Sequence, residues 1–219
     1  MRIALIHAVS VAMQPVADAF AAGWPEVELV NVLDDSLSPD RARDSALTPT
    51  ISLRIESLAD YVHGAGADGI LYTCSAFGPA IEAVARRLPI PVLKPNEAMF
   101  EQSIRRGSRI GMLATFAPSV ATMEEEFAEQ ARKERVRPSL TTIVVKGAME
   151  ALRKGDAATH NELIAARAGE LADCDAIMLA HFSTSRAAAA VSATVRCPVL
   201  SSPAAAVSLL KQRLLGNPH

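Results

Sequence analysis

The sequence is poor in aromatic residues and in cysteine. Phe, Trp and Tyr make up 4% of its 219 residues, whereas hydrophobic residues make up 50%. Because Ala, Val, Leu and Ile abound, this composition favours buried parallel strands covered by Ala-rich helices over an all-β fold. The three cysteines have no CxxC spacing. They therefore argue against a disulfide framework or a structural zinc site, and they fit a reducing compartment.

Long apolar runs and an excess of charge of one sign are also missing. No stretch approaches the roughly 18 uninterrupted apolar residues of a membrane span, and the first apolar run, Ile3–Ile6, is far shorter than the roughly 7 to 15 residues of a signal-peptide core. The 22 basic and 24 acidic residues are mixed along the chain. No field of one sign attracts nucleic acid or anionic lipid. We therefore expect a cytoplasmic protein that binds neither nucleic acid nor membrane.

The usual motifs for cofactors are absent from the sequence. It contains no GxGxxG and no GxxxxGK[ST], the glycine-rich turns that hold dinucleotides and nucleotide phosphates. HxxxH spacing is missing too, so a metal site is not expected. The sequence implies no cofactor.

Short apolar runs alternate with longer amphipathic stretches along the chain, which is typical of repeated β-α units around a mostly parallel sheet. Their Val, Ile and Leu content predicts strands buried on both faces. The pattern predicts eight strands: Ile3–His7, Val27–Val32, Gly69–Thr73, Pro91–Leu93, Arg109–Ala114, Leu140–Val145, Ala176–Ala180 and Val199–Ser201.

Helices are expected between these strands, several of them with proline in the first turn, where its missing N–H is harmless. The segment Asp34–Asp40 has turn chemistry and is predicted to be a polar loop that covers a site. The eight expected helices are Val11–Ala22, Pro49–Gly64, Gly78–Leu88, Pro95–Arg106, Pro118–Lys133, Ala157–Ala172, Ser185–Thr194 and Pro203–Leu215.

Two portions of the chain resemble each other. Asp68–Ser75 and Asp175–Phe182 both run from an apolar strand into a polar turn, and each is followed by a helix and a Pro-Val-Leu strand. We infer an α/β fold of two pseudo-symmetric three-layer αβα subdomains with mostly parallel sheets. Ligands bind at the carboxyl ends of strands in such sheets. The repeat therefore predicts an active-site cleft between the subdomains, with Cys74 and His181 on its two sides.

Cys74 is the residue most suited to chemistry. It ends an apolar strand and precedes a helix, a position at which the helix field and nearby N–H donors favour a thiolate. The alternative is a small inert core residue, but a polar turn is not a core position. Cys174 and Cys197 precede strands at the opposite end of the sheet and are expected to be structural.

Histidines and hydroxyls follow other strands. His181 takes the place of Cys74 in the second copy and is either a proton donor or acceptor, or a packed turn residue. His7 ends the first strand and either binds substrate or caps a turn. Thr115 and Ser119 lie where helix N-terminal amides hold a carboxylate, although ordinary capping explains each singly. The remaining histidines, which we expect to be solvated, are His63, His160 and His219.

In this order, these pieces resemble the aspartate/glutamate/hydantoin racemase superfamily. The family works without a cofactor, typically as a homodimer, with two cysteines that take an α-proton from one face of the substrate and return it on the other. The resemblance also implies a first subdomain of residues 1–95 plus 202–219 and a second of residues 96–201. It is carried by Asp68–Ser75, Ile110–Thr115, Asp175–Ala180, Pro198–Leu200 and Ala204–Val207.

The chain departs from the family at the second cysteine. Cys74 matches the first, but His181 stands where the second is expected. Three outcomes follow: His181 replaces the missing acid, it activates Cys74 as a nucleophile, or catalysis is lost. The family's decarboxylases keep one cysteine, at the second position rather than the first.

The leading hypothesis is a cofactor-independent racemase, epimerase or isomerase of a small carboxylate, such as an amino acid, hydantoin or dicarboxylate. Cys74 and His181 are its proton-transfer residues. The alternatives are a Cys74-nucleophile isomerase or decarboxylase/lyase, and an inactive small-molecule binding protein. The residues expected to bind substrate are His7, Ser10, Ser75, Ala76, Thr115, Ser119, Phe182 and Ser183.

Overall fold

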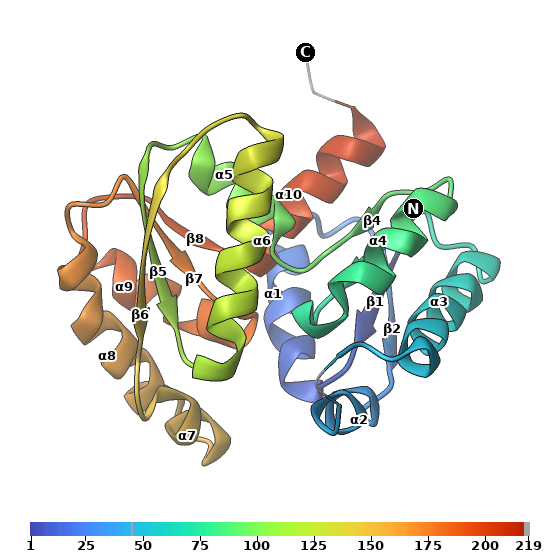
Figure 1. Cartoon of the computed structure of the whole chain (residues 1–219), viewed down its shortest axis with the longest axis horizontal. Helices are drawn as coiled ribbons and strands as arrows, with labels where there is room; N and C mark the ends of the chain where they lie inside the picture. Colours follow the sequence, from blue (N-terminus) through green and yellow to red (C-terminus); the bar gives the residue numbers. More distant parts are fainter. Residues whose placement is uncertain (45, 217–219) are drawn as a thin grey trace. The chain divides into compact units, whose positions relative to one another are not determined.

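The computed structural model describes residues 1–44 and 46–216, with the side chain of Pro118 excepted. The chain divides into two compact units. Unit 1 comprises Met1–Pro95 and Ala206–His219, and unit 2 comprises Asn96–Ala205. Each unit is built around its own parallel sheet (Figure 1).

The sheet of unit 1 has four parallel strands in the order β2-β1-β3-β4. The two central strands are almost entirely buried because they are covered on both faces, whereas β2 at the edge is partly exposed. Apolar residues along the central strands thus form the core. The strands are β1 (Arg2–His7), β2 (Glu28–Leu33), β3 (Gly69–Tyr72) and β4 (Val92–Leu93).

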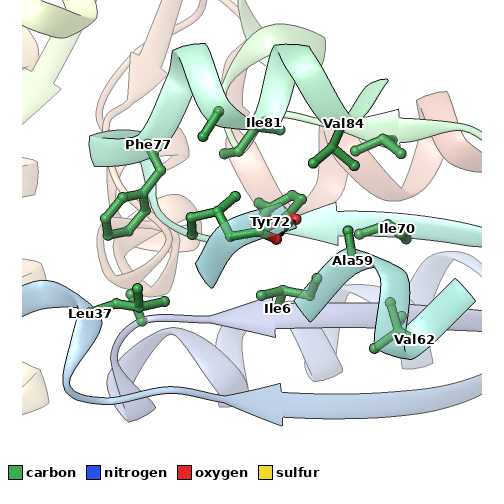
Figure 2. Packing of buried hydrophobic residues seen from close by; sticks show 14 of the residues in the cluster. Ile6, Leu37, Ala59, Val62, Ile70, Tyr72, Phe77, Ile81 and Val84 are labelled. Atoms are coloured by element: carbon green, nitrogen blue, oxygen red, sulfur yellow. Dashed lines mark hydrogen bonds between the residues drawn. The ribbon is translucent and has the colours of Figure 1, made fainter. Parts of the chain in front are cut away.

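Helices cover both faces of this sheet. Figure 2 shows Ile6 and Ile70 on one face, packed with Ala59 and Val62 of α3 and with Ile81 of α4. The helices of unit 1 are α1 (Met13–Gly23), α2 (Leu37–Ala42), α3 (Pro49–Gly64), α4 (Gly78–Arg87) and the part of α10 (Ser202–Leu215) from Ala206 onward, with the 3-10 turns η1 (Ser10–Ala12) and η2 (Ser75–Phe77).

The opposite face of this sheet packs against α10. Side chains alternate along a strand, so the Cα hydrogen of Gly69 that a side chain would replace faces the side of the sheet opposite to Ile70. A Cβ at that position would lie 3.2 Å from Leu214 and 3.3 Å from Leu210. The absence of a side chain at Gly69 therefore lets the helix approach closely. Lys211 of the same helix donates to the carbonyl oxygen of Gly23 at the end of α1.

Unit 2 repeats the plan, with four parallel strands in the order β6-β5-β7-β8. One face of its sheet, with Ile177 and Leu179, packs against α8 and α9. On the other face α5 lies on β7 and β8 (Figure 1). Phe100 of α5 meets Phe127 of α6 edge-to-face, with ring centroids 5.7 Å apart.

The strands of unit 2 are β5 (Arg109–Ala114), β6 (Ser139–Val144), β7 (Ala176–Leu179) and β8 (Val199–Ser201). Its remaining elements are α5 (Glu97–Ile104), η3 (Ala117–Ser119), α6 (Val120–Lys133), α7 (Ala148–Arg153), α8 (Ala157–Ala168), η4 (Gly169–Leu171), η5 (Ser183–Ala187) and α9 (Ala188–Ser192).

The expected α/β class is confirmed, and all eight strands form within two residues of the predicted bounds. Three details were wrong. The Asp34–Asp40 loop contains the start of α2, because Leu37 is fully buried there. The helix α7 was missed; it follows Gly147, whose φ of 81° suits glycine. Edge strands β2 and β6 are not buried on both faces.

Within the described part of the chain, no helix is long and apolar enough to cross a membrane.

Candidate active-site residues

Cys74 lies two residues beyond the end of β3, immediately before η2. Its backbone is extended, with φ −131° and ψ 125°, and the chain then turns through η2 into α4. The side chain is half-buried and contacts the edge of the hydrophobic cluster under α3 and α4. The turn thus holds the thiol at the carboxyl end of the sheet while leaving part of it accessible.

A buried polar network lies beneath this turn. His7 Nε2 lies 3.0 Å from Asn31 Oδ1, and His7 Nδ1 lies 2.9 Å from Thr73 Oγ1. Burial lowers the pKa of His7, and the hydrogen bond with Asn31 offsets this only in part. The ring is therefore neutral at pH 7. Nε2–H donates to Asn31, and the Thr73 hydroxyl donates to Nδ1.

His7 consequently uses both ring nitrogens inside the protein and is fully buried. Its predicted contact with substrate stays a prediction. The structure indicates a positioning role for His7, because its hydrogen bond with Thr73 connects the end of β1 to the residue before Cys74. Asn31 and Thr73 were missed from the sequence, since only the strand register brings β2 and β3 alongside β1.

Arg41 is a second residue that the sequence did not single out. This half-buried residue of α2 donates from Nε to the carbonyl oxygen of Ala76 at 3.3 Å and from Nη1 to the carbonyl oxygen of Asp44 at 2.7 Å. Both acceptors are neutral. Among the described residues, no carboxylate pairs with its guanidinium. A positive charge without an anion therefore lies against the cysteine turn.

The other predicted residues of unit 1 surround the same turns. Ser75 is half-buried in η2, directly after Cys74, and Ala76 is exposed. Ser10 is exposed at the start of η1, after β1. Each stands after the carboxyl end of a central strand, as expected for groups around a ligand.

His181 occupies in unit 2 the place of Cys74 in unit 1, two residues beyond the end of the corresponding strand, β7. Its φ is 72°, in the left-handed region, which costs of order 1–3 kcal/mol for a residue with a side chain. Burial lowers its pKa to about 4, and the Ala180 carbonyl opposes this weakly. The imidazole is thus neutral at pH 7.

One hydroxyl group contacts the imidazole of His181. Ser119 Oγ lies 2.6 Å from His181 Nε2, while Nδ1 is buried without a hydrogen-bond partner among the described residues. Thr115 and Thr184 lie with their hydroxyl oxygens 3.4 Å apart. Thr184 was missed from the sequence, because no motif marks it.

Ser183 and Phe182 are both buried beside His181. The structure therefore brings together Thr115, Ser119, His181 and the start of η5 at one edge of the sheet of unit 2.

The remaining cysteines and histidines lie elsewhere. Cys174 and Cys197 precede β7 and β8 and are half-buried, and burial raises the pKa of both thiols. His160 was expected to be solvated, but that expectation is wrong: the ring is fully buried in α8, with Nδ1 2.9 Å from Asn161. His63 is half-buried.

His219 lies outside the described residues. In the part of the chain that the structure covers, no cluster of three or more His, Cys, Asp and Glu side chains is placed to hold a metal ion.

A surface pocket of unit 2 contains none of the predicted site residues. It lies between α6 and the segment before β6, at the amino end of that strand, and its lining includes Phe127, Arg132 and Arg137. The carboxyl ends of the strands carry the candidate chemistry instead.

Comparison with known protein families decides the classification. Residues 8–210 match the family described as Asp/Glu/Hydantoin racemase. This chain is a member of that family. The match spans both units, so the family resemblance expected from Asp68–Ser75 and Asp175–Ala180 is confirmed.

Solved structures of several racemases have the same fold as this chain. An allantoin racemase from Klebsiella pneumoniae has 17% sequence identity and a TM-score of 0.74, with 97% of this chain and 86% of that chain covered. For a glutamate racemase from Bacillus anthracis the identity is 14% and the TM-score 0.71, with coverages of 97% and 81%.

A variant of arylmalonate decarboxylase has 19% identity and a TM-score of 0.69, with coverages of 100% and 97%. No curated protein sequence matches the chain. At these identities the structural likeness establishes the fold alone.

Proposed function

We propose that this family member is a cofactor-independent racemase, epimerase or isomerase of a small carboxylate, with Cys74 and His181 as its proton-transfer residues. One observation carries the proposal. The two sheets have the same strand order, and a thiol in one and an imidazole in the other stand at the same place after corresponding strands. Thiols and imidazoles are both side chains that act as general acids and bases in enzymes.

The reaction begins with loss of a proton from the carbon next to a carboxylate or carbonyl. In one direction the Cys74 thiolate takes this proton, and charge builds up on the carboxylate oxygens. Main-chain N–H groups and hydroxyls at the turns stabilise this charge. Return of a proton from the other residue to the opposite face inverts the centre. The proposal requires both residues to reach one substrate molecule.

The two proton carriers are unequal. Because the pKa of His181 is about 4, its ring is a neutral imidazole at pH 7 in the protein without substrate, and this form is a much weaker acid than the imidazolium. A bound carboxylate nearby raises this pKa, since an opposite charge favours the imidazolium. We therefore propose that the substrate itself prepares His181 as an acid, and that kcat differs between the two directions.

The uncompensated charge of Arg41 supports an anionic substrate. Its guanidinium donates to the carbonyl oxygen of Ala76, two residues after Cys74. The Nη2 group makes no hydrogen bond within the described residues. A carboxylate is the natural partner of a guanidinium. Dicarboxylates are therefore favoured over neutral hydantoins as substrates.

Proton exchange in D₂O tests the proposal. The protein is incubated with a panel of amino acids, hydantoins, maleate and substituted malonates, and deuterium at carbon is followed by NMR. Exchange that disappears in Cys74→Ala and falls at least about 100-fold in His181→Gln is the expected result. Cys174→Ala is the matched control, because this thiol precedes β7 at the other end of the sheet. Full exchange activity in Cys74→Ala would rule the proposal out.

A second candidate function follows from the low pKa of His181, which makes its imidazole a weak base and leaves Cys74 as the remaining reactive group. Cys74 then acts as a nucleophile in an isomerisation, or as the proton donor after a decarboxylation or other lyase reaction. Mass spectrometry separates these possibilities. A substrate adduct on Cys74 supports covalent catalysis, and loss of CO₂ from a malonate supports decarboxylation. Binding of the panel compounds without any turnover would instead identify a binding protein.

A further inference from the structure

Arg54 of α3 joins two carboxylates of the segment that contains α2. Its Nη1 donates to Asp40 Oδ2 at 2.6 Å, and its Nη2 donates to Asp34 Oδ2 at 2.5 Å. Asp34 precedes α2 and Asp40 lies within it. None of the three side chains is more than 31% exposed. One planar guanidinium therefore ties this segment to α3 at two points.

The contacts of Arg54 are strong because they involve charged groups. Burial raises the pKa of Asp34, but hydrogen bonds from Ser36 and Arg54 and the charge of Arg54 lower it overall. The hydroxyl of Ser36 donates to Asp34 Oδ1 at 2.6 Å and accepts from Arg54 Nη2 at 2.5 Å. Asp34 is thus ionised at pH 7, and hydrogen bonds between ionised groups are about twice as strong as neutral ones.

The helix α2 depends on such contacts. It has six residues, and its N-cap residue, Ser36, makes no capping hydrogen bond with its side chain. Helices this short are not stable by themselves. Leu37 is the buried residue of α2, and it packs in the hydrophobic cluster that includes Phe77 (Figure 2). A single apolar anchor leaves α2 able to rotate about that point, and the two bonds to Arg54 prevent this rotation.

Arg54 also engages the carboxylate next to Arg41 in the chain. Asp40 accepts from Arg54 with Oδ2 and from Arg43 with Oδ1, whereas Arg41 donates to the carbonyl oxygen of Ala76. The side chain of Arg43 is 76% exposed, and an exposed ion pair contributes little. Arg54 is therefore the main partner that keeps Asp40 in place and occupied.

We propose that Arg54 is a positioning residue for substrate specificity: through Asp34 and Asp40 it holds α2 so that the guanidinium of Arg41 lies at the cysteine turn and binds a carboxylate of the substrate. Arg54 acts through Arg41, since both of its terminal nitrogens are already bonded to the two carboxylates. This inference deepens the proposed function, and its kinetic test rests on it.

Hydrogen exchange of the full-length protein, followed by NMR at pH 7, tests the tie without any substrate. The amides of Asp40 and Arg43 donate to the carbonyl oxygens of Ser36 and Asp40, so their exchange reports the opening of α2. In Arg54→Met these amides should exchange at least about tenfold faster, because two charge-assisted bonds are lost. Amides of β3 should stay protected, which shows that the fold is intact.

Arg87→Met is the matched control. Arg87 of α4 also pairs with a carboxylate of α3, Asp60, at 2.7 Å, and this pair does not include α2. Its loss should leave the exchange of the α2 amides unchanged. The proposal would be overturned by unchanged exchange in Arg54→Met, or by an equal acceleration in Arg87→Met.

Kinetics tests whether Arg54 acts on specificity. With a dicarboxylate that the protein turns over, Arg54→Met should raise KM about three- to tenfold, a typical coupling within one ion-pair network, and change kcat less than about twofold. The double variant Arg41→Met/Arg54→Met is decisive. If Arg54 acts through Arg41, the KM of the double variant equals that of Arg41→Met alone. Effects that multiply would show a separate structural role for Arg54 and would overturn the proposal.

The two kinds of failure are distinguishable. If no compound of the panel is turned over, the proposed function fails and the specificity role of Arg54 fails with it, whereas hydrogen exchange still decides whether Arg54 holds α2. If a dicarboxylate is turned over and its KM is the same in Arg54→Met, only the role of Arg54 fails.

Discussion

Asp175 holds the beginning of β5 through Arg109, whose main-chain N–H donates to Asp175 Oδ2 at 2.9 Å. The same bond recurs in unit 1, where the main-chain N–H of Arg2 donates to Asp68 Oδ2 at 2.7 Å. Donor and acceptor are 66 residues apart in both units. The two units thus share this hydrogen bond as well as their strand order, and this supports treating Cys74 and His181 as equivalent positions.

Removal of the buried hydroxyl under the cysteine turn should destabilise the protein. Thr73→Val leaves the Nδ1 atom of His7 buried without its partner, and we expect a loss of about 1–3 kcal/mol in the free energy of unfolding. Urea denaturation measures it.

The matched control for this experiment is Thr142→Val. Its hydroxyl is buried in β6 with no hydrogen-bond partner among the described residues, so its replacement should be neutral or stabilising. Equal losses in the two variants would contradict the network assigned to His7.

Loss of the charge at position 41 should weaken binding of doubly charged substrates. Arg41→Met removes the uncompensated guanidinium at the cysteine turn, and KM for a dicarboxylate should rise about tenfold or more, as expected for one charge-assisted hydrogen bond. For a neutral hydantoin, which has no carboxylate, KM should change little. Arg43→Met is the control, because this exposed neighbour pairs with Asp40. Similar effects on both substrate classes would disprove the role.

Protonation of His181 should destabilise the folded protein in mild acid. Its pKa is about 4 in the fold, against 6.5 for an ordinary histidine. Between these values the unfolded chain binds more protons, so the free energy of unfolding falls as the pH drops from about 6.5 to 4, by at most about 3 kcal/mol.

The variant His181→Gln should flatten this pH dependence. Some slope persists in His181→Gln, because burial also lowers the pKa of His7. Chemical denaturation at a series of pH values checks the difference. An unaltered slope in His181→Gln would mean that the ring is not protected from protonation.

Restoring a second thiol should make the reaction more symmetric. In His181→Cys, two thiols stand at the equivalent positions, and two like groups exchange the roles of acid and base with similar barriers. The ratio of the forward and reverse kcat values should therefore move toward one. Turnover of each enantiomer at saturating concentration, followed by deuterium incorporation, measures this ratio. An unchanged ratio would show that His181 does not set the asymmetry.

The sequence was sufficient to predict the positions of the strands, because the buried strands at the centre of each sheet appear as apolar runs such as Ile70–Tyr72. It was also sufficient for residues that end a strand, since Cys74 and His181 share a repeated pattern. It was insufficient for α2 and α7, which have six residues each and depend on tertiary contacts rather than on a long periodic pattern.

The hydrogen-bond partners of the candidate site residues could not be predicted from the sequence either. Asn31, Thr184 and Arg41 gain their roles from contacts across 24, 69 and 35 residues of chain, respectively. His160 was misjudged because a helix has a buried and an exposed side, and a lone histidine does not reveal which of them it occupies.

The two units differ in when they can be completed during synthesis. Unit 2 is one continuous segment, Asn96–Ala205, and the Ser202 hydroxyl near its end donates to Asn96 at its beginning, at 2.7 Å. Unit 1 lacks the helix that covers Gly69 until Leu210 and Leu214 have been made. The part of the unit 1 sheet around Gly69 therefore stays uncovered until α10 has been synthesised. Chaperones that bind exposed apolar strands should accordingly recognise the first unit of the nascent chain.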